Sequence, residues 1–429
     1  MAALAEPSPH AIASLADAQL LEHVQRQTFR YFWDGAHPVS GLVFDRRGRS
    51  PSQDSDNRIA VGGSGFAIMA LIVAAERGWV SRAAALERLG QMLAVLTRAS
   101  CYHGAFPHFM DGATGATIPF SRKDDGGDLV ETSFLCMGLL CARQYFDRAT
   151  PAEQRLRHTV TYLWEEVEWS WYTRGARKVL YWHWSPHNGW ALEHEIRGWN
   201  ECLITYVLAA SAPRYAVDPR VYHDGFAAGR QFVNGKSYHG IELPLGPAYG
   251  GPLFFAHYSF CALDPHGLED RYADYWQQNL RQVHIQHAYC SENPRGYTGY
   301  GPACWGLTAS DDPEGYAAHA PGDDNGTISP TASLASFPYA PHESMQALRH
   351  FLTHPSERLW GRYGFIDAFC ESRNWYADSF LAIDQGPIII MIENHRSGLL
   401  WRLFMSVPEV QQGLRRLGFT SPHLAAAGP

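Results

Sequence analysis

The sequence alternates between two kinds of helical segment, and this alternation restricts the possible folds more than any other feature. Segments that start near residues 62, 126, 198, 250, 325 and 385 are apolar or small on every side. Amphipathic segments come before, between and after them, at 17–35, 81–100, 150–172, 218–233, 268–293, 342–354 and 407–417. A helix that is apolar all round must be enclosed by other helices. The pattern therefore predicts an all-α (α/α)6 toroid, with six inner helices surrounded by six outer ones.

The same pattern bears on domain organisation. An irregular helical bundle and a helical solenoid are the alternatives, but a solenoid would repeat its sequence at a fixed period, and no such repeat is found. No linker rich in Ser, Gly or Pro divides the 429 residues. We therefore expect a single domain over residues 18–418, preceded by an extension at 1–17 and followed by a tail at 419–429.

Charge and cysteine content exclude several classes of protein. The net charge of −8 argues against a nucleic-acid partner, because Lys and Arg are not in excess. The eight cysteines include no C-x-x-C pair, so we expect neither a metal nor a redox cofactor. The sequence contains no run of about 18 apolar residues, which a membrane-spanning helix would need, so we expect no membrane span. The first residues lack a basic region followed by an apolar stretch, so no signal peptide is visible.

Aromatic residues make up 13% of the chain, including 14 Trp and 21 Tyr. Such residues pack cores, but their planes also stack against the C–H faces of sugar rings. Segments 241–249, 294–324 and 356–384 are rich in Gly, Tyr and Trp, and loops of this kind build sites on rigid scaffolds. We expect aromatic residues to line a cleft, and ordinary loop packing is the alternative for each of them. The candidates are Trp199, Tyr297, Tyr300, Trp305 and Trp375.

Acidic residues gather at the starts of the inner segments, which strict alternation would place at one end of the toroid. They are Asp124, Asp125, Asp128, Glu131, Glu201, Asp323, Asp324 and Asp384. Helix capping and the helix dipole explain several of these positions. They explain Glu201 less well, because it lies within an apolar run, and Glu131 less well, because it lies one turn inside its segment. A carboxylate that faces an inner cavity costs free energy of folding unless it is paired with another group or serves in binding or catalysis.

Carboxylates that converge on an aromatic-lined cleft suggest cleavage of a glycosidic bond. That reaction needs a protonated acid at the leaving oxygen and a carboxylate that activates water. The apolar neighbours of Glu201 would raise its pKa, which suits the acid. The start of a helix stabilises an anion, which suits Asp384 as the base. Groups on opposite sides of a ring leave room for water, so inversion of configuration is expected.

Four stretches resemble the glycoamylase-like domain family, over roughly residues 18–418. They are "GGDLVETSFL", "GWNECLITYVLAASAP", "DDNGTISPTASLASFPYAPHESM" and "NWYADSFLAIDQGPIIIMIENHRSGLLW". The resemblance implies an (α/α)6 fold and endo-acting hydrolysis of β-1,2-glucan. By position it implies that Asp128 and Glu131 are cleft acids and that Glu201 is the general acid.

The resemblance does not identify the general base. The loop before the last inner segment carries Asp367, Glu371, Asp378 and Asp384, and the motif does not choose among them. We favour Asp384 because it stands at the mouth of the segment, with Asp378 as the alternative. The acids Asp124 and Asp324 and the arginines Arg122 and Arg373 are expected near the cleft, where they would bind substrate or orient carboxylates.

Other functions remain open on the sequence. A sugar epimerase or isomerase on the same toroid would use histidines such as His183, His187, His194 or His395. A polysaccharide lyase would need a basic cleft, which the acidic balance disfavours. A transglycosylase and a non-catalytic glycan-binding protein are further alternatives. We expect a monomer that acts on an oligo- or polysaccharide. The family implies a periplasmic or secreted location, and the cytoplasm remains an alternative.

Overall fold

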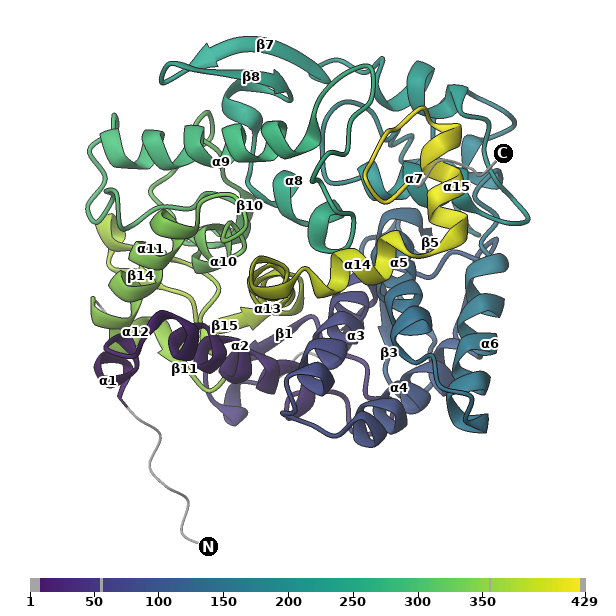
Figure 1. Cartoon of the computed structure of the whole chain (residues 1–429), viewed down its shortest axis with the longest axis horizontal. Coiled ribbons are helices and arrows are strands. Elements are labelled where there is room, and N and C mark those ends of the chain that lie inside the picture. Colours follow the sequence, from purple (N-terminus) through teal and green to yellow (C-terminus); the bar gives the residue numbers. More distant parts are fainter. Residues whose placement is uncertain (1–7, 55–56, 355, 425–429) are drawn as a thin grey trace, which may run out of the picture.

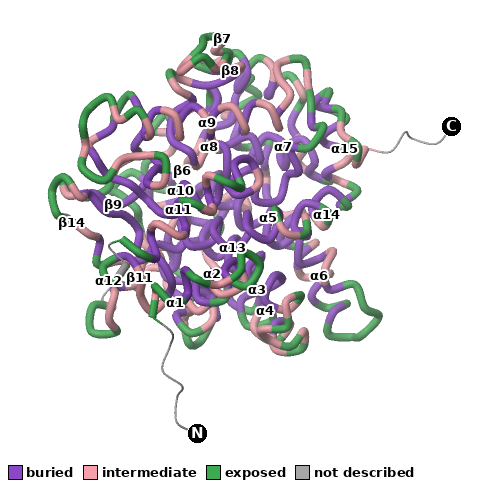
Figure 2. Tube along the Cα trace, turned by 60° about the vertical axis from the view of Figure 1, so that its left-hand side comes forward, coloured by how far each residue is buried: buried purple, intermediate pink, exposed green. Residues whose placement is uncertain are grey.

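The computed structural model describes residues 8–54, 57–354 and 356–424. Helices form the body of the molecule, and the buried segments concentrate at its centre, while exposed ones lie in outer loops (Figure 2). The helices buried along most of their length are α3 (Val61–Glu76), α5 (Leu129–Tyr145), α7 (Leu203–Ser211), α10 (Pro330–Leu334) and α13 (Ala382–Ser397), and the short helix α8 (Phe254–His257) is buried over its second half.

These buried helices contact one another in a closed series. Helix α3 packs against α5, and α5 packs against α7. Helix α7 meets the 3-10 turn Ser259–Cys261 that follows α8, and this turn contacts α13. Helix α13 also contacts α10 and α3, which closes the series near the middle of Figure 1. The enclosed segments of the sequence are therefore the ones that surround the centre.

Amphipathic helices cover the buried ones. They are α2 (Asp17–Trp33), α4 (Arg82–Leu96), α6 (Pro151–Glu165), α9 (Tyr275–Glu292), α11 (Pro341–Thr353), α14 (Leu399–Met405) and α15 (Pro408–Arg416). Side-chain caps fix the N-terminal ends of two of these outer helices, α4 and α6. Ser81 accepts a hydrogen bond from the backbone N–H of Ala84, at 3.1 Å. Thr150 accepts one from Glu153, at 3.3 Å, with Pro151 at the first helical position.

Two glycines allow α3 and α5 to approach each other closely in the core. A Cβ on Gly65 of α3 would lie 2.1 Å from the carbonyl oxygen of Phe134 in α5. A Cβ on Gly138 of α5 would lie 2.2 Å from the carbonyl oxygen of Gly65. The two helix backbones therefore touch, and any side chain at these positions would force them apart. This contact fixes the starts of α3 and α5 next to each other.

Short antiparallel pairings connect the loops at the helix starts, so the all-α description does not cover the loops. The pairs are β1 (Arg46–Gly48) with β15 (Ser379–Leu381), β5 (Gly127–Asp128) with β6 (His183–Trp184), β9 (Ala309–Asp312) with β10 (Gly315–Ala318), β11 (Trp360–Gly361) with β12 (Gly364–Phe365), and β13 (Phe369–Cys370) with β14 (Trp375–Tyr376). Strand β3 (Phe109–Asp111) pairs with β2 (Arg58–Ala60) and β4 (Thr117–Ile118). Strands β2, β5 and β15 run directly into α3, α5 and α13 and so fix where these helices begin.

The prediction of an outer helix over 218–233 is wrong. This segment forms one π-helical turn, Val221–Phe226, and leads to the hairpin of β7 (Val233–Tyr238) and β8 (Ile241–Leu245) at the upper edge of Figure 1. The reason is close backbone packing at two glycines. A Cβ on Gly225 would lie 2.1 Å from the carbonyl oxygen of Lys178, and one on Gly229 would lie 2.3 Å from the nitrogen of Gly198.

Two inner helices are shorter than the sequence predicts. Gly250 and Gly251 adopt φ angles of 91° and 75°, which glycine reaches without the strain of a side chain. Helix α8 therefore begins only at Phe254. Helix α10 begins at Pro330, which stands at the first helical position.

Both ends of the described chain pack on the helical body. The short helix α1 (Pro9–Ala13) contacts α11 and α12 (Ser356–Leu359). Near the other end, Thr420 pairs with Glu269, and His423 Nε2 lies 2.7 Å from Asp264 Oδ2. The boundaries predicted at 18 and 418 thus fall beside segments that pack on the same body. Within the described ranges, every helix is too short or too polar to span a bilayer.

Candidate functional site

A cavity of about 490 Å³ opens where the buried helices begin. Gly63 of α3, Glu131 of α5, Phe254 of α8 and Ile383 of α13 line it, together with Glu201, which stands just before α7. The prediction that the starts near 126, 198 and 385 meet at one end is therefore confirmed. The structure brings Glu131 and Glu201, two of the predicted site residues, to one cavity.

Glu201 offers a partly exposed carboxyl to this cavity. The Glu201 backbone is fixed by a hydrogen bond that Ser259 Oγ donates to the Glu201 carbonyl oxygen. No arginine, lysine or histidine of the described ranges forms an ion pair with its side chain. Burial raises the pKa of Glu201 to about 7. The group can therefore hold a proton near neutral pH, as its apolar neighbours in the sequence predict.

Asp384 lies in the first turn of α13 and is 2% exposed. Tyr258, which lines the cavity, donates a hydrogen bond from its hydroxyl to Asp384 Oδ1 at 3.4 Å. Burial is the largest influence and raises the pKa of Asp384. Among the described residues, the Asp384 carboxyl accepts a hydrogen bond from the Tyr258 hydroxyl and none from a backbone N–H of its helix. Capping alone therefore does not explain why this carboxyl stands at the start of an apolar helix.

Arg46 supplies positive charge beside the acids around Asp384. Its guanidinium lies 3.0 Å from Asp311 Oδ1 and 3.6 Å from Asp45 Oδ2, and both Arg46 and Asp45 line the cavity. Burial opposes the charged form of Arg46, but Asp311 and Asp45 outweigh it and raise the pKa of Arg46. The cation is thus held in place at the cavity wall.

Asp128 is completely buried and acts as a hub for hydrogen bonds. Its Oδ1 accepts from the backbone N–H groups of Val130 and Glu131, at 3.0 and 2.9 Å. Its Oδ2 lies 2.9 Å from His108 Nδ1 and accepts from Trp182 Nε1 at 3.2 Å. Burial raises the pKa of Asp128, but the bond from His108 and its charge lower it overall. Asp128 therefore caps α5 and orients two residues that line the cavity.

Glu131 and His108 both line the cavity, and each shifts the pKa of the other. Glu131 Oε2 accepts a hydrogen bond from the backbone N–H of Gly62 at 2.6 Å. Burial raises the pKa of Glu131, and His108 opposes this rise. Burial lowers the pKa of His108, but Glu131 and Asp128 outweigh it and raise that pKa to about 9. A protonated histidine therefore faces the cavity near neutral pH.

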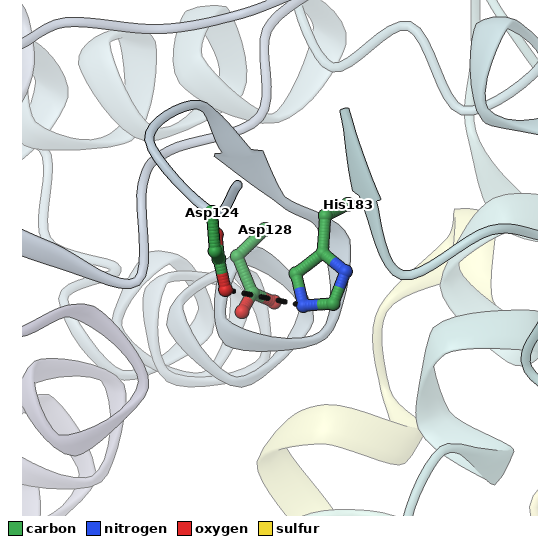
Figure 3. A group of neighbouring side chains, drawn as sticks. All are labelled: Asp124, Asp128 and His183. Carbon is green, nitrogen blue, oxygen red and sulfur yellow. Dashed lines mark ion pairs between the residues drawn. The ribbon is translucent and has the colours of Figure 1, made fainter. Parts of the chain in front are cut away.

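Asp124, Asp128 and His183 lie together and deserve consideration as metal ligands (Figure 3). One ligand atom from each lies within 4.8 Å of the others, and His183 Nε2 is 3.2 Å from Asp124 Oδ2. Four nitrogen neighbours already engage the two oxygens of Asp128. We therefore infer that these three residues have a structural role and hold strands β5 and β6 together, in which Asp128 and His183 are paired residues.

The aromatic residues that line the cavity differ from those predicted. Trp199 and Trp305 are 3% and 0% exposed, and Trp199 packs against Phe232, Phe260 and Tyr275. Tyr297, Tyr300 and Trp375 also lie outside the cavity lining. Its aromatic lining consists of Phe109, Phe120, Phe134, Trp182, Phe254, Tyr258 and Tyr316.

Two of these lining aromatics expose much of their surface. Phe120 lies in the loop between β4 and β5 and is 55% exposed, and Tyr316 lies in β10 and is 52% exposed. Tyr316 belongs to the loop 294–324 that the sequence singles out, so this signal could have found it. Phe120 stands two residues after β4 and carries no comparable signal.

Four further predicted residues lie away from the cavity lining. Asp324 is buried and accepts hydrogen bonds from the hydroxyls of Tyr289 and Tyr300. Arg373 is exposed and forms an ion pair with Glu314. Arg122 is exposed as well. Asp378 is also exposed, and it borders a separate hollow beside Arg46 and Asp311.

Comparison with known proteins places this chain among bacterial relatives. The family model named Glycoamylase, with the description "Putative glucoamylase", matches residues 193–408. Over 424 residues, the chain is 45% identical to the exo beta-1,2-glucooligosaccharide sophorohydrolase (non-reducing end) of Parabacteroides distasonis. The match covers 94% of this chain but 58% of that protein, so the chain spans little more than half of its curated relative.

Solved structures match over nearly the whole chain. A putative glucoamylase from Bacteroides uniformis is 54% identical, with a TM-score of 0.93, and the match covers 96% of this chain and 99% of that one. An endo-beta-1,2-glucanase from Chitinophaga pinensis, in complex with sophorotriose and glucose, is 50% identical with a TM-score of 0.92. That match covers 96% of this chain and 100% of the other.

Proposed function

This chain belongs to the Glycoamylase family, and from that premise we propose that it is a glycoside hydrolase that cleaves β-1,2-linked glucan. One observation carries the proposal: Glu201, with a pKa raised to about 7, lines the same cavity as Tyr258, whose hydroxyl donates a hydrogen bond to the buried carboxyl of Asp384. The names of the Parabacteroides and Chitinophaga relatives support the β-1,2 linkage. The closed series of helix contacts supports the (α/α)6 toroid as its scaffold.

Glu201 is the general acid in this proposal. Its carboxyl enters the reaction protonated and gives its proton to the glycosidic oxygen as the bond to the anomeric carbon breaks. The partly exposed position of Glu201 gives a glucan access to the carboxyl. The lack of an ion-paired cation among the described residues keeps its pKa high enough for this role.

Asp384 is the general base. It takes one proton from a water molecule, and the resulting hydroxide oxygen bonds to the anomeric carbon from the side opposite the leaving group. The product then has inverted configuration. Burial raises the pKa of Asp384, and the hydrogen bond from the Tyr258 hydroxyl and the dipole at the first turn of α13 oppose this rise and favour the ionised form.

The cavity walls suit a neutral sugar chain. His108 and Arg58 carry N–H donors and Glu131 carries an acceptor, so the wall offers both kinds of partner to sugar hydroxyls. Phe120 and Tyr316 offer exposed rings for stacking. The chain therefore combines polar groups that fix orientation with aromatic planes that supply contact area.

We infer endo action, because the Chitinophaga relative named as an endo-glucanase matches across the full length of both chains. Incubation with long β-1,2-glucan tests this inference. Endo action gives a range of oligosaccharides and a rapid loss of viscosity, whereas exo action gives one short product from the start. Proton NMR of the first products reports the anomer, and the α-anomer is expected.

Other outcomes of the same incubation would replace the proposal. An epimerase or isomerase would leave chain length unchanged, and a transglycosylase would form new linkages without a matching gain in reducing ends. A glycan-binding protein would bind the polymer and release nothing. Glu201→Gln serves as the control, because contaminating glucanase activity would survive that substitution. We further propose a monomer that acts outside the cytoplasm, which sedimentation and cell fractionation would test.

A further inference from the structure

Asp367 and Asp384 form a pair of buried carboxyls at the start of α13. Each residue is 2% exposed. Two hydroxyls from the start of α10 hold the backbones of the pair. Ser329 Oγ donates to the carbonyl oxygen of Asp367 at 2.6 Å, and Thr331 Oγ1 donates to that of Asp384 at 2.7 Å. Because the two donors stand two residues apart, they fix the two aspartates side by side.

Each carboxyl has one oxygen with a donor and one without. Asp367 Oδ2 accepts from the backbone N–H of Asp311 at 2.7 Å, and Asp384 Oδ1 accepts from Tyr258. Asp367 Oδ1 and Asp384 Oδ2 have no hydrogen-bond donor among the described residues. Buried polar atoms are rarely left without partners. The two carboxyls interact directly, so one proton held between them satisfies both oxygens.

The charges around the pair favour this single proton. The titratable groups that face it are Asp45, Arg46, Tyr258, Asp311 and Tyr316. Arg46 is the cation of this set, and it is already paired with Asp311 and Asp45. Two ionised aspartates would therefore add repulsion to a site that is already acidic.

The proton belongs on Asp367. Burial and the charge of Asp384 raise the pKa of Asp367 well above its usual range. Burial also raises the pKa of Asp384, but the hydrogen bond from Asp367 lowers it. The backbone N–H of Asp311 fixes the other oxygen of Asp367, so the O–H of Asp367 is aimed at its partner.

We propose that Asp367 is a positioning residue that stays protonated and donates its proton to a hydrogen bond with Asp384, so that Asp384 meets the attacking water as an oriented, ionised carboxylate. The inference rests on the proposed role of Asp384 as the base. In the reaction, an O–H bond of water breaks, its proton goes to Asp384, and the hydroxide oxygen bonds to the anomeric carbon. Asp367 keeps its proton throughout, and Asp384 later releases the acquired proton to solvent.

The pH dependence of kcat tests the proposal in two variants. In Asp367→Asn, the amide oxygen can accept from Asp311 while the NH2 group donates to Asp384. We expect the acidic limb of the kcat profile to stay within about 0.5 pH unit of the wild type, with kcat within about 10-fold. Asp367→Ala removes the donor, so the acidic limb should move up by about one unit and kcat should fall at least about 10-fold. Asp218→Asn, at an exposed residue paired with Arg220, is the matched control and should change neither.

Two results would overturn the proposal. A downward move of the acidic limb by about one unit in Asp367→Asn would show that Asp367 is an anion in the wild type, because the substitution would then remove a repelling charge. An unchanged limb in both variants would show that Asp367 does not act on Asp384. If Asp367→Ala fails to fold, Asp367→Asn and the spectroscopic measurement below decide the question.

Infrared difference spectroscopy provides a readout that needs no substrate. At about pH 8, the wild type should show a protonated carboxyl band that Asp367→Asn lacks and Asp218→Asn keeps. Absence of this difference would refute the shared proton. A wild type that shows the band but cleaves no β-1,2-glucan would overturn the proposed function and the role of the pair in catalysis, while leaving the shared proton itself in place.

Discussion

Glu201→Gln should abolish activity and yet make the protein more stable at alkaline pH. The swap is nearly isosteric, so the fold should persist, but glutamine cannot donate the proton that departs with the leaving oxygen. We expect kcat to fall about 10²–10⁴-fold. The gain in stability arises because the folded protein disfavours the ionised form of Glu201, and glutamine has no ionised form.

The magnitude follows from the pKa. Folding raises the pKa of Glu201 from 4.5 to about 7. A group with a raised folded-state pKa binds its proton more tightly in the folded protein, so its contribution to stability is complete below 4.5 and is lost as the pH rises through 7. At about 1.36 kcal/mol per unit, the loss reaches about 3 kcal/mol at pH 8 and stays below about 1 kcal/mol at pH 5. Glutamine should avoid this loss.

Urea unfolding of wild type and variant at the two pH values measures the difference in the free energy of unfolding. Glu242→Gln, at an exposed glutamate of the β7–β8 hairpin, is the matched control and should give no pH-dependent gain. If Glu201→Gln shows the same stability difference from the wild type at both pH values, Glu201 does not carry a raised pKa. If it retains full activity, another group is the acid.

Three further substitutions test other parts of the structure. Asp384→Asn should keep the hydrogen bond from the Tyr258 hydroxyl but lower kcat about 10²–10⁴-fold, and a stable, fully active variant would exclude Asp384 as the base. Gly65→Ala should lower the free energy of unfolding by about 1–3 kcal/mol, because its Cβ would meet the backbone of α5. Gly90→Ala on the exposed face of α4 is its control and should stabilise by about 0.5–1 kcal/mol, and thermal unfolding compares the two. Tyr316→Ala should raise KM several-fold without a change in melting temperature, since its ring is 52% exposed beside the cavity, and an unchanged KM would remove it from the binding surface.

The sequence predicts the scaffold well because its signals are local. An apolar face repeats along each helix regardless of distant contacts, so the enclosed segments could be identified from their own residues. The position of Glu201 follows from the same logic, because a carboxylate within an apolar run at a helix start can only face the centre. The failure over 218–233 comes from backbone packing at glycines, which depends on the distant segments that lie nearby. The late start of α8 comes from two glycines with positive φ angles.

The cavity walls were harder to predict for a different reason. Trp199 stands two residues before Glu201 and Trp182 has no acidic neighbour in the sequence, but only the folded loops decide that Trp199 packs in the core and Trp182 lines the cavity. The pairing of Asp367 with Asp384 joins residues separated by three short strands and a 3-10 turn, and no periodicity connects them. Aromatic content therefore indicates the class of ligand, but it does not identify the residues that meet it.

The ring of helix starts also explains how one end of the fold can hold both ionised and protonated carboxyls. Buried apolar helices leave free N–H groups at their first turns, and a carboxyl that receives several of these donors is stabilised as an anion. Asp128 receives two backbone N–H groups together with His108 and Trp182, and its pKa is lowered despite complete burial. Glu201 receives no comparable set of donors, and its pKa rises to about 7. Between these two carboxyls, the number of donors, more than the depth of burial, thus decides which one has the raised pKa, and acid catalysis requires a carboxyl that can hold a proton near neutral pH.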